Sequence, residues 1–182
     1  MVGFSKIPLK QGNSDDFQSP AEAIDCLVPY LNKEWTIWEC AMGKGNLLSA
    51  FRKKGFEVLG TDIIAEEPYN IDFLKDDNFV WEIECIITNP PYSLKEKFLE
   101  RCYKIGKPFA LLMPLTGLES EKRQKLFRQY GIQLIIPNKR FNFETPSGKG
   151  SGSWFATAWF THGLNLPKDI MFVDIRSKNG KL

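Results

Sequence analysis

The chain has 182 residues, of which 43% are hydrophobic and 25% are charged, and it carries a formal net charge of +2. These values are typical of one globular domain and exclude a fibre or a chain too polar to fold. The small net charge neither requires nor excludes a nucleic acid as partner.

The sequence contains no segment of the kind used for export or for crossing a membrane. No apolar run approaches the roughly 18 residues of a membrane-spanning helix, and the first residues lack the apolar core of a signal peptide. We therefore expect a cytoplasmic protein. The four cysteines are widely spaced and form no Cys-x-x-Cys pair, so we expect buried, reduced thiols.

The chain divides into an arm and a single domain. Residues 1–18 are polar and irregular, and we assign them to an N-terminal arm. The domain, residues 19–182, begins with a predicted helix that Ser19 caps, with Pro20 at its first position and Glu22 at its third.

Strands and helices alternate through the rest of the domain. Apolar runs predict strands at residues 36–40, 56–61, 85–88, 109–113, 132–136 and 154–160, and helical spacing predicts helices at 46–54, 94–105 and 119–130. This order predicts an α/β fold with a Rossmann-like, doubly wound and mostly parallel sheet. Residues 154–160 follow a strand without an intervening helix, so we expect an antiparallel hairpin strand there. Residues 71–74 fit a short strand or a loop, and the run 170–175 has no assigned place.

A glycine-containing turn and two acidic residues suggest a ligand site. Gly43 and Gly45 follow the first strand, where a doubly wound sheet binds its ligand, although an ordinary tight turn explains two glycines equally well. Asp62 ends the second strand 19 residues after Gly43, where a carboxylate could accept both ribose hydroxyls. Asp72 and Phe73 follow at the expected end of a third strand, where they could contact an adenine edge.

The sequence Asn89-Pro90-Pro91-Tyr92 ends the apolar run that precedes it. Two consecutive prolines stop a helix or a central strand, so the chain must turn there. The turn displays an amide, carbonyl groups and an aromatic ring, which together suit a planar ring that carries an amine. A plain strand end, with Asn89 in a turn and Tyr92 in packing, is the alternative interpretation.

These residues resemble the class I S-adenosylmethionine-dependent methyltransferases, and within them the adenine-N6 amino methyltransferases that carry Asp/Asn-Pro-Pro-Tyr/Phe. The resemblance covers roughly residues 15–160. It implies S-adenosylmethionine as cofactor, with Phe17, Ser19 and Pro20 at the methionine end and serine in place of the family's usual threonine. It further implies contacts from Glu39, Ala41, Gly43 and Gly45 in the cofactor loop, from Asp62 and Ile63 at the ribose, and from Asp72 and Phe73 at the adenine.

The tetrapeptide then has a chemical role. The Asn89 side-chain oxygen and the Pro90 carbonyl could accept the two amine hydrogens of adenine, so that the nitrogen lone pair faces the methyl group. Tyr92 would stack on a base that has left the duplex. No metal or strong base is required, and we expect no metal site.

The substrate is expected to be a nucleic acid. Residues 121–149 contain seven lysines and arginines against two glutamates. We expect Lys139, Arg140, Lys149 and the helix 122–128 to contact phosphates. Phe141 or Phe143 resembles the family's aromatic residue that closes over a flipped base, although packing within the hairpin explains both residues equally well.

Neither residues 74–84 nor 161–182 can hold a target-recognition domain, so we expect a minimal, phage-like enzyme whose sequence choice is slight or encoded in loops. DNA is the favoured substrate and RNA is the serious alternative. Cytosine-N4 methylation, methylation of a protein glutamine and a non-catalytic nucleic-acid-binding module remain open.

Overall fold

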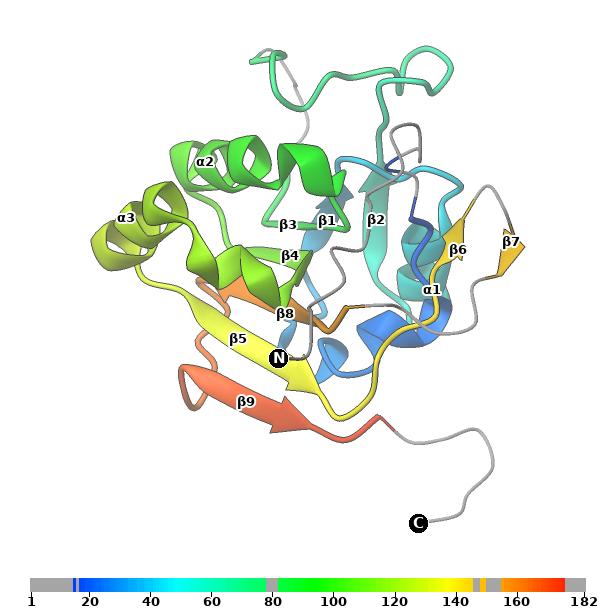
Figure 1. The fold of residues 1–182 in the computed structure, drawn as a ribbon. Helices are drawn as coiled ribbons and strands as arrows, with labels where there is room; N and C mark the ends of the chain where they lie inside the picture. Colours follow the sequence, from blue (N-terminus) through cyan, green and yellow to red (C-terminus); the bar gives the residue numbers. More distant parts are fainter. Residues whose placement is uncertain (1–14, 16, 78–81, 146–147, 150–154, 176–182) are drawn as a thin grey trace, which may run out of the picture.

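The computed structural model describes residues 15, 17–77, 82–145, 148–149 and 155–175. These residues form a sheet of seven strands in the order β2-β1-β3-β4-β8-β5-β9 (Figure 1). The strands are β1 (Thr36–Glu39), β2 (Glu57–Gly60), β3 (Cys85–Thr88), β4 (Phe109–Pro114), β5 (Gln133–Pro137), β8 (Thr157–His162) and β9 (Ile170–Val173). A separate small hairpin consists of β6 (Glu144–Thr145) and β7 (Gly148–Lys149).

The sheet is parallel except at one strand. β1 pairs in parallel with β2 and β3, β3 with β4, and β5 with β9, whereas β8 is antiparallel to both β4 and β5. The predicted fold class is therefore confirmed, including the antiparallel strand reached without a helix. β8 begins at Thr157, later than the expected start at residue 154, which lies outside the described residues.

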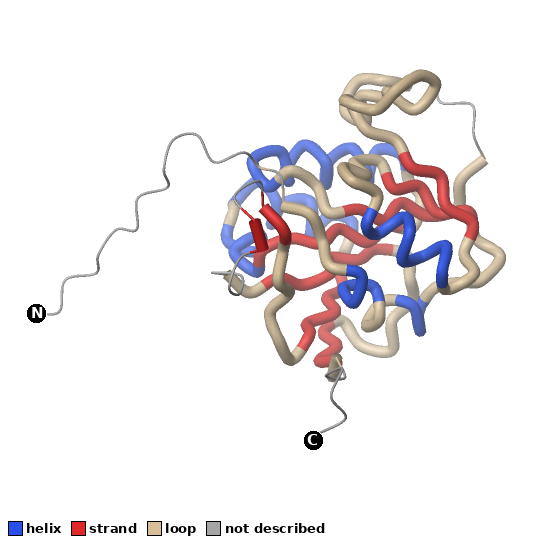
Figure 2. Tube along the Cα trace, turned by 90° about the vertical axis from the view of Figure 1, so that its right-hand side faces the viewer, coloured by secondary structure: helices blue, strands red, loops and turns tan. Residues whose placement is uncertain are grey.

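Helices cover both faces of the sheet (Figure 2). The α-helices are α1 (Asn46–Lys53), α2 (Lys95–Ile105) and α3 (Glu121–Tyr130), and the 3-10 helices are η1 (Ala21–Ile24), η2 (Val28–Tyr30), η3 (Tyr92–Leu94) and η4 (Leu115–Glu119). Ile37 and its equivalents on the other strands pack with η1 and α1, while Trp38 and its equivalents pack with α2 and α3. Neighbouring residues of one strand thus enter opposite cores, as a sheet buried on both faces requires.

The predicted helix after residue 19 is wrong in type. The segment forms the two short 3-10 helices η1 and η2, and Ser19 makes no capping hydrogen bond. Pro29 supplies the reason, because it lacks a backbone N–H and disfavours helical geometry at the residue before it.

The third strand implied ahead of Asp72 and Phe73 is also absent, since described residues 61–77 contain no strand and β2 forms the edge of the sheet. The Asp72 carboxylate accepts from Leu74 N at 3.0 Å and from Lys75 Nζ at 2.8 Å, which holds the segment in a turn. Phe73 is buried between Trp38 and Phe98. Both interactions favour a turn that packs on the core, rather than a strand that pairs with β2.

Two expectations about the whole chain can be compared with the structure. The four cysteines are free and buried, as predicted. Among the helices of the described residues, none has both the length and the apolar character needed to cross a membrane. Most of the assigned arm, residues 1–14 and 16, lies outside the described residues.

Candidate functional site

The carboxyl ends of the parallel strands bring the predicted segments to one edge of the sheet. The glycine turn follows β1, Asp62 follows β2, and Asn89 follows β3 (Figure 1). The register holds these ends level, because Glu39 lies opposite Gly60 across β1 and β2, and Trp38 lies opposite Ile86 across β1 and β3. The two halves that the sequence predicted are therefore neighbours in space.

The glycine turn is tied to the end of β2. Gly43 N donates to Asp62 Oδ2 at 2.8 Å, and Met42 N donates to Thr61 O at 3.0 Å. Gly43 has a φ of +50° and Gly45 a φ of +74°, values that glycine adopts without the strain that a side chain would bring. Asp62 thus shapes the turn with Oδ2, while its Oδ1 accepts from Ile64 N at 3.1 Å, and each oxygen can accept a further hydrogen bond.

Glu39, the last residue of β1, is a buried carboxyl group. It is 2% exposed, and its Oε2 atom has no hydrogen-bond partner among the described residues. Burial raises the pKa of Glu39 to about 8, and repulsion from Asp62 adds to the shift. A neutral carboxyl with an unused oxygen at the glycine turn fits a ligand that brings a donor or a positive charge.

Asn89 presents an oxygen acceptor. Its Nδ2 atom donates to Phe17 O at 2.7 Å, while its Oδ1 atom is buried and has no partner within the described part of the chain. Because the Phe17 carbonyl can only accept, this contact fixes which end of the amide faces it. Asn89 Oδ1 is left facing away from Phe17, and a buried acceptor without a partner costs about 1–3 kcal/mol until a ligand satisfies it.

Aromatic rings enclose Tyr92, which is 9% exposed. Phe17 stacks on it with ring centroids 5.4 Å apart, and Phe143 and Phe155 approach edge-on at 6.4 and 5.5 Å. Burial raises the pKa of the Tyr92 phenol well above its usual range, so the group stays neutral and is no base. Sequence reasoning missed Phe155 as a site residue, because it assigned this residue to the strand predicted at 154–160, whereas β8 begins at Thr157.

A segment that we name the strap, Asp15 with Phe17 and Gln18, crosses both halves of the site. Asp15 Oδ2 accepts from Ser93 N at 2.7 Å, and Gln18 Oε1 accepts from Lys44 N at 2.9 Å. A Cβ at Gly43 would lie 2.6 Å from Gln18 Nε2, so this amide packs directly on the glycine turn. Phe17 was predicted to be at the site, and Gln18 lies inside the segment 16–20 that the resemblance places there, whereas Asp15 was not predicted. The next residue, Ser19, is buried, and Pro20 precedes η1.

Several predicted cofactor residues have other contacts. Asp72 holds Lys75, which keeps the pKa of Asp72 below its ordinary value. The Phe73 ring belongs to the core, so a contact with adenine would have to come from its backbone or from Asp72. Ile63 is 67% exposed beside Asp62, and Ala41 is partly buried at the start of the turn.

The predicted substrate residues separate into two groups. Lys139 and Arg140 are exposed just after β5, and Lys149 lies in β7, opposite Glu144. Phe143 is the aromatic candidate that contacts Tyr92, whereas Phe141 is 1% exposed within the core.

The predicted contact of the helix 122–128 with phosphates needs one correction. Arg123 is buried, and its Nε donates to Gly117 O at 2.6 Å. This hydrogen bond joins α3 to η4. Its charge is therefore not presented to a phosphate. Lys122 is exposed and pairs with Glu96 at 3.3 Å.

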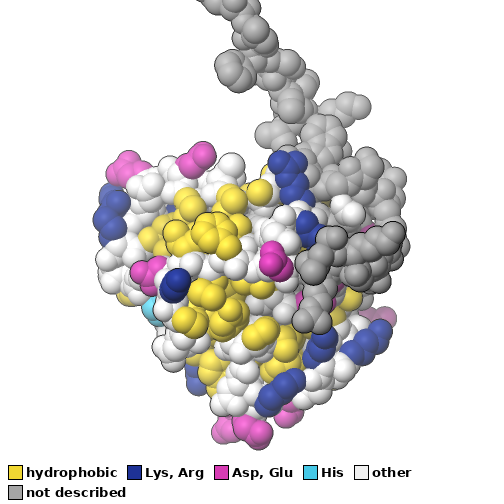
Figure 3. All heavy atoms as spheres, turned by 90° about the horizontal axis from the view of Figure 1, so that it is seen from below, with side chains coloured by type: hydrophobic (Ala, Val, Ile, Leu, Met, Phe, Trp, Pro, Cys, Tyr) yellow, Lys and Arg dark blue, Asp and Glu magenta, His cyan; other side chains and the backbone are white. Residues whose placement is uncertain are grey.

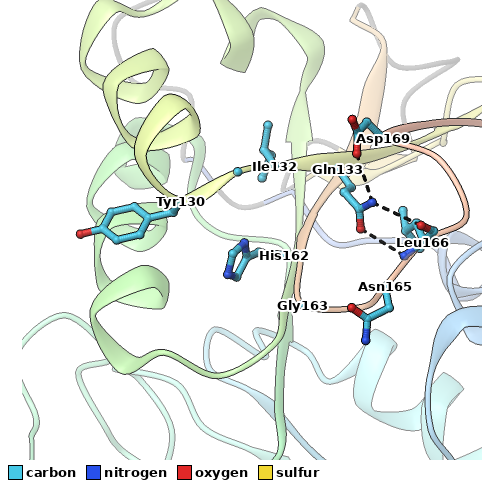
Figure 4. A pocket seen from close by; sticks show the side chains of 9 residues that line it. Tyr130, Ile132, Gln133, His162, Gly163, Asn165, Leu166 and Asp169 are labelled. Carbon is cyan, nitrogen blue, oxygen red and sulfur yellow. Dashed lines mark hydrogen bonds between the residues drawn. The ribbon is translucent and has the colours of Figure 1, made fainter.

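A hollow of about 490 Å³ lies elsewhere, at the amino end of β5 and the carboxyl end of β8 (Figure 4). Gln133 donates to Leu166 O and to Asp169 Oδ1, each at 3.3 Å, beside Asn165. This end of the sheet is opposite to the catalytic candidates, and none of the predicted site residues lines the hollow.

Comparison with known proteins identifies the fold. No protein-family model and no curated protein matches the sequence. A modification subunit of a putative type I restriction enzyme from Vibrio vulnificus aligns with a TM-score of 0.54 at 14% identity, over 91% of this chain and 48% of that one. A putative RNA methyltransferase from Pyrococcus horikoshii aligns with a TM-score of 0.53 at 11% identity, over 78% of this chain and 77% of that one. The chain, which spans about half the length of the modification subunit, has the class I methyltransferase fold.

Proposed function

We propose that this protein is an S-adenosylmethionine-dependent methyltransferase that transfers a methyl group to the exocyclic N6 amine of adenine in DNA. The observation that carries the proposal is Asn89 Oδ1, a buried acceptor without a partner among the described residues, in a motif that also presents Tyr92. Such an atom suits the N–H of an incoming amine.

The cofactor side of the site has fitting chemistry. S-adenosylmethionine supplies an electrophilic methyl group on a positively charged sulfur. The buried Glu39 carboxyl oxygen would accept a hydrogen bond from the cofactor. The Gly43 turn would allow the cofactor to approach the backbone closely. Asp62 would accept from the ribose, with Ile63 beside it.

The acceptor side acts through position and hydrogen bonding. An adenine amine is a weak nucleophile because its lone pair is delocalised into the ring. Asn89 Oδ1 and the Pro90 carbonyl would accept its two hydrogens, which localises the lone pair and directs it at the methyl carbon. The cofactor would supply the methyl group, so the nitrogen–carbon bond would form as the carbon–sulfur bond breaks, and the amine proton would leave afterwards. Tyr92, which stays neutral, would stack on the base after the Phe17 ring that now stacks on it moves aside.

DNA is proposed as the polymer on two grounds. One structural neighbour is described as the modification subunit of a restriction enzyme, and the exposed Lys139 and Arg140 suit phosphate contacts near the site. RNA is the second candidate, since the other neighbour is described as a putative RNA methyltransferase.

The test is transfer of labelled methyl from S-adenosylmethionine to duplex DNA, single-stranded DNA, RNA and protein in parallel, followed by identification of the product. We expect N6-methyladenine in DNA. Asn165→Ala, a substitution in the hollow at the opposite end of the sheet, should transfer at the wild-type rate. Label in RNA alone would replace the proposed polymer, and no label on any nucleic acid would contradict the proposal.

A further inference from the structure

Strand β9 leaves an unusual edge. β9 pairs with β5 on one side, and no described strand covers its other side. Its sequence is Ile-Met-Phe-Val, with Ile170 50% and Phe172 80% exposed. Figure 3 views the side on which β9 lies in Figure 1, and hydrophobic side chains gather there. Edge strands are normally protected by charges, proline or a bulge, because an open apolar edge pairs with another strand.

The backbone of β9 restricts which residues can pair. Leu134 N donates to Asp169 O at 2.7 Å and Asn138 N donates to Val173 O at 2.9 Å, so the odd-numbered residues direct their carbonyls at β5. Successive residues of a strand alternate in direction. The N–H and C=O groups of Ile170 and Phe172 therefore face the open edge.

We propose that β9 pairs antiparallel with β9 of a second copy of this chain, about a two-fold axis at Met171. In this register Ile170 lies opposite the partner's Phe172, and each such pair exchanges both of its N–H···O hydrogen bonds. Because only even-numbered residues offer groups to the open edge, registers that pair an even with an odd residue are excluded.

Charge complementarity selects this register among those that remain. Lys168 and Asp174 are exposed and flank the apolar residues. Asp174 directly follows the strand, and its carboxylate accepts from Asn138 Nδ2 at 2.9 Å, whereas Lys168 lies in the bend before Ile170. With the axis at Met171, the bend that carries Lys168 lies next to the partner's Asp174 at both ends of the pair. A shift of two residues in either direction sets Phe172 opposite the partner's Lys168 or Ile170 opposite the partner's Asp174. The apolar edge strand, with one charge before it and the opposite charge after it, is thus self-complementary about this axis.

The dimer leaves the candidate site free. The catalytic tetrapeptide follows β3, which is separated from β9 by β4, β8 and β5. A two-fold axis across antiparallel strands turns the carboxyl ends of the two sheets in opposite directions, so neither copy contributes to the other's site. The proposal therefore stands apart from the proposed function, and methyl transfer per protomer should not depend on association.

The first experiment measures the mass of the full chain by sedimentation or light scattering over about 1–100 μM, the range suited to a small interface. We expect a monomer–dimer equilibrium that Phe172→Lys weakens at least about tenfold. Ile64→Lys is the matched control, because Ile64 is 85% exposed on the loop after β2, at the other edge of the sheet. A monomer at every concentration, or equal loss in both variants, would overturn the proposal.

The second experiment tests the register. The two-fold axis places Met171 opposite the partner's Met171 in a non-hydrogen-bonded pair, with Cα atoms about 4.5 Å apart, within reach of a disulfide. Met171→Cys should form a covalent dimer on mild oxidation, whereas Phe172→Cys should not. Lys168→Glu and Asp174→Lys should each weaken association several-fold, and the double variant should recover it. Cross-linking at residue 172 in preference to 171, or no recovery in the double variant, would contradict this pairing.

Discussion

At the scale of single residues, the site holds the two amide or carboxyl oxygens among the buried side-chain atoms that lack a partner in the described residues. The other such atoms are the hydroxyls of Ser19, Thr88, Tyr92 and Thr157 and the Nε atom of Arg101. Asn89 Oδ1 and Glu39 Oε2 each lack a partner among the described residues, and each lies at the carboxyl end of a central strand. Buried polar atoms are almost always hydrogen-bonded in folded proteins. In the proposed function, Asn89 Oδ1 would accept from the target amine and Glu39 Oε2 would accept from the cofactor.

The orientation of the Asn89 amide can be tested with Asn89→Asp. Asn89 Nδ2 now donates to Phe17 O at 2.7 Å. In the variant a carboxylate oxygen would take the place of Nδ2 and repel the Phe17 carbonyl oxygen, and only the protonated acid could donate a hydrogen bond there. We expect methyl transfer at least about tenfold below wild type at pH 8, rising relative to wild type as the pH falls toward 5. The measurement is initial rate against pH. A wild-type rate at pH 8 would show that Phe17 does not set the amide orientation.

Glu39→Gln should change the pH dependence of stability. The pKa of Glu39 is about 8 in the folded chain, against about 4.3 for an unperturbed glutamate. Between these values the folded chain holds a proton that the unfolded chain has released, so the free energy of unfolding falls as the pH rises. Urea unfolding of the cofactor-free protein at pH 5, 7 and 8.5 should show this fall in wild type and a flatter profile in Glu39→Gln.

The exposed Glu34 supplies the control for that experiment, because Glu34→Gln should keep the wild-type profile. The Glu39→Gln substitution should also weaken S-adenosylmethionine binding, since an amide cannot ionise to a carboxylate beside the cation. Equal pH profiles in wild type and Glu39→Gln would contradict the role given to its burial.

At the scale of elements, the strands that carry the site were predictable and the segments that cover it were not. β3 matches its predicted bounds and β1 and β2 match theirs within two residues at either end, because buried parallel strands are continuous apolar runs. The strap depends on contacts between residues far apart in sequence, such as Gln18 with Lys44, which no local pattern encodes. The missing third strand shows the same limit, since burial of Phe73 between Trp38 and Phe98 decided it. The 3-10 helices differ, because Pro29 is a local signal that the sequence already contained.

Gln18 packs where the glycine turn would receive a ligand, which predicts displacement of its side chain on cofactor binding. Gln18→Ala removes a hydrogen bond worth about 1 kcal/mol, so the cofactor should bind about fivefold more tightly. Calorimetry measures the affinity, with Gln129→Ala on the exposed side of α3 as control. Weaker binding in Gln18→Ala would show instead that Gln18 helps to hold the cofactor.

At the scale of the whole molecule, the parallel order of β2, β1 and β3 brings three turns to one edge and so joins the two halves of the site. The two similar solved structures share this architecture at 14% and 11% identity. Similarity at this level shows the fold, and the choice of DNA as substrate is a proposal. The surface charges next to this edge are the feature that should select a nucleic acid.

Replacement of both Lys139 and Arg140 by alanine should weaken binding of duplex DNA. Each lost phosphate contact should reduce the slope of log affinity against log salt by about 0.9 for duplex DNA. Lys107→Ala is the control, because this exposed lysine precedes β4 at the opposite end of the sheet. An unchanged slope in the double variant would place the phosphate contacts elsewhere.

The central claim is that Asn89 directs the target amine to the methyl group. The most direct measurement compares wild type and Asn89→Ala for methyl transfer to an adenine-containing duplex and for S-adenosylmethionine affinity. We predict that the variant loses transfer by a factor of at least about 100 while the cofactor binds within about threefold of wild type, since the amide acts on the acceptor and not on the cofactor. Transfer at the wild-type rate by Asn89→Ala would contradict the account.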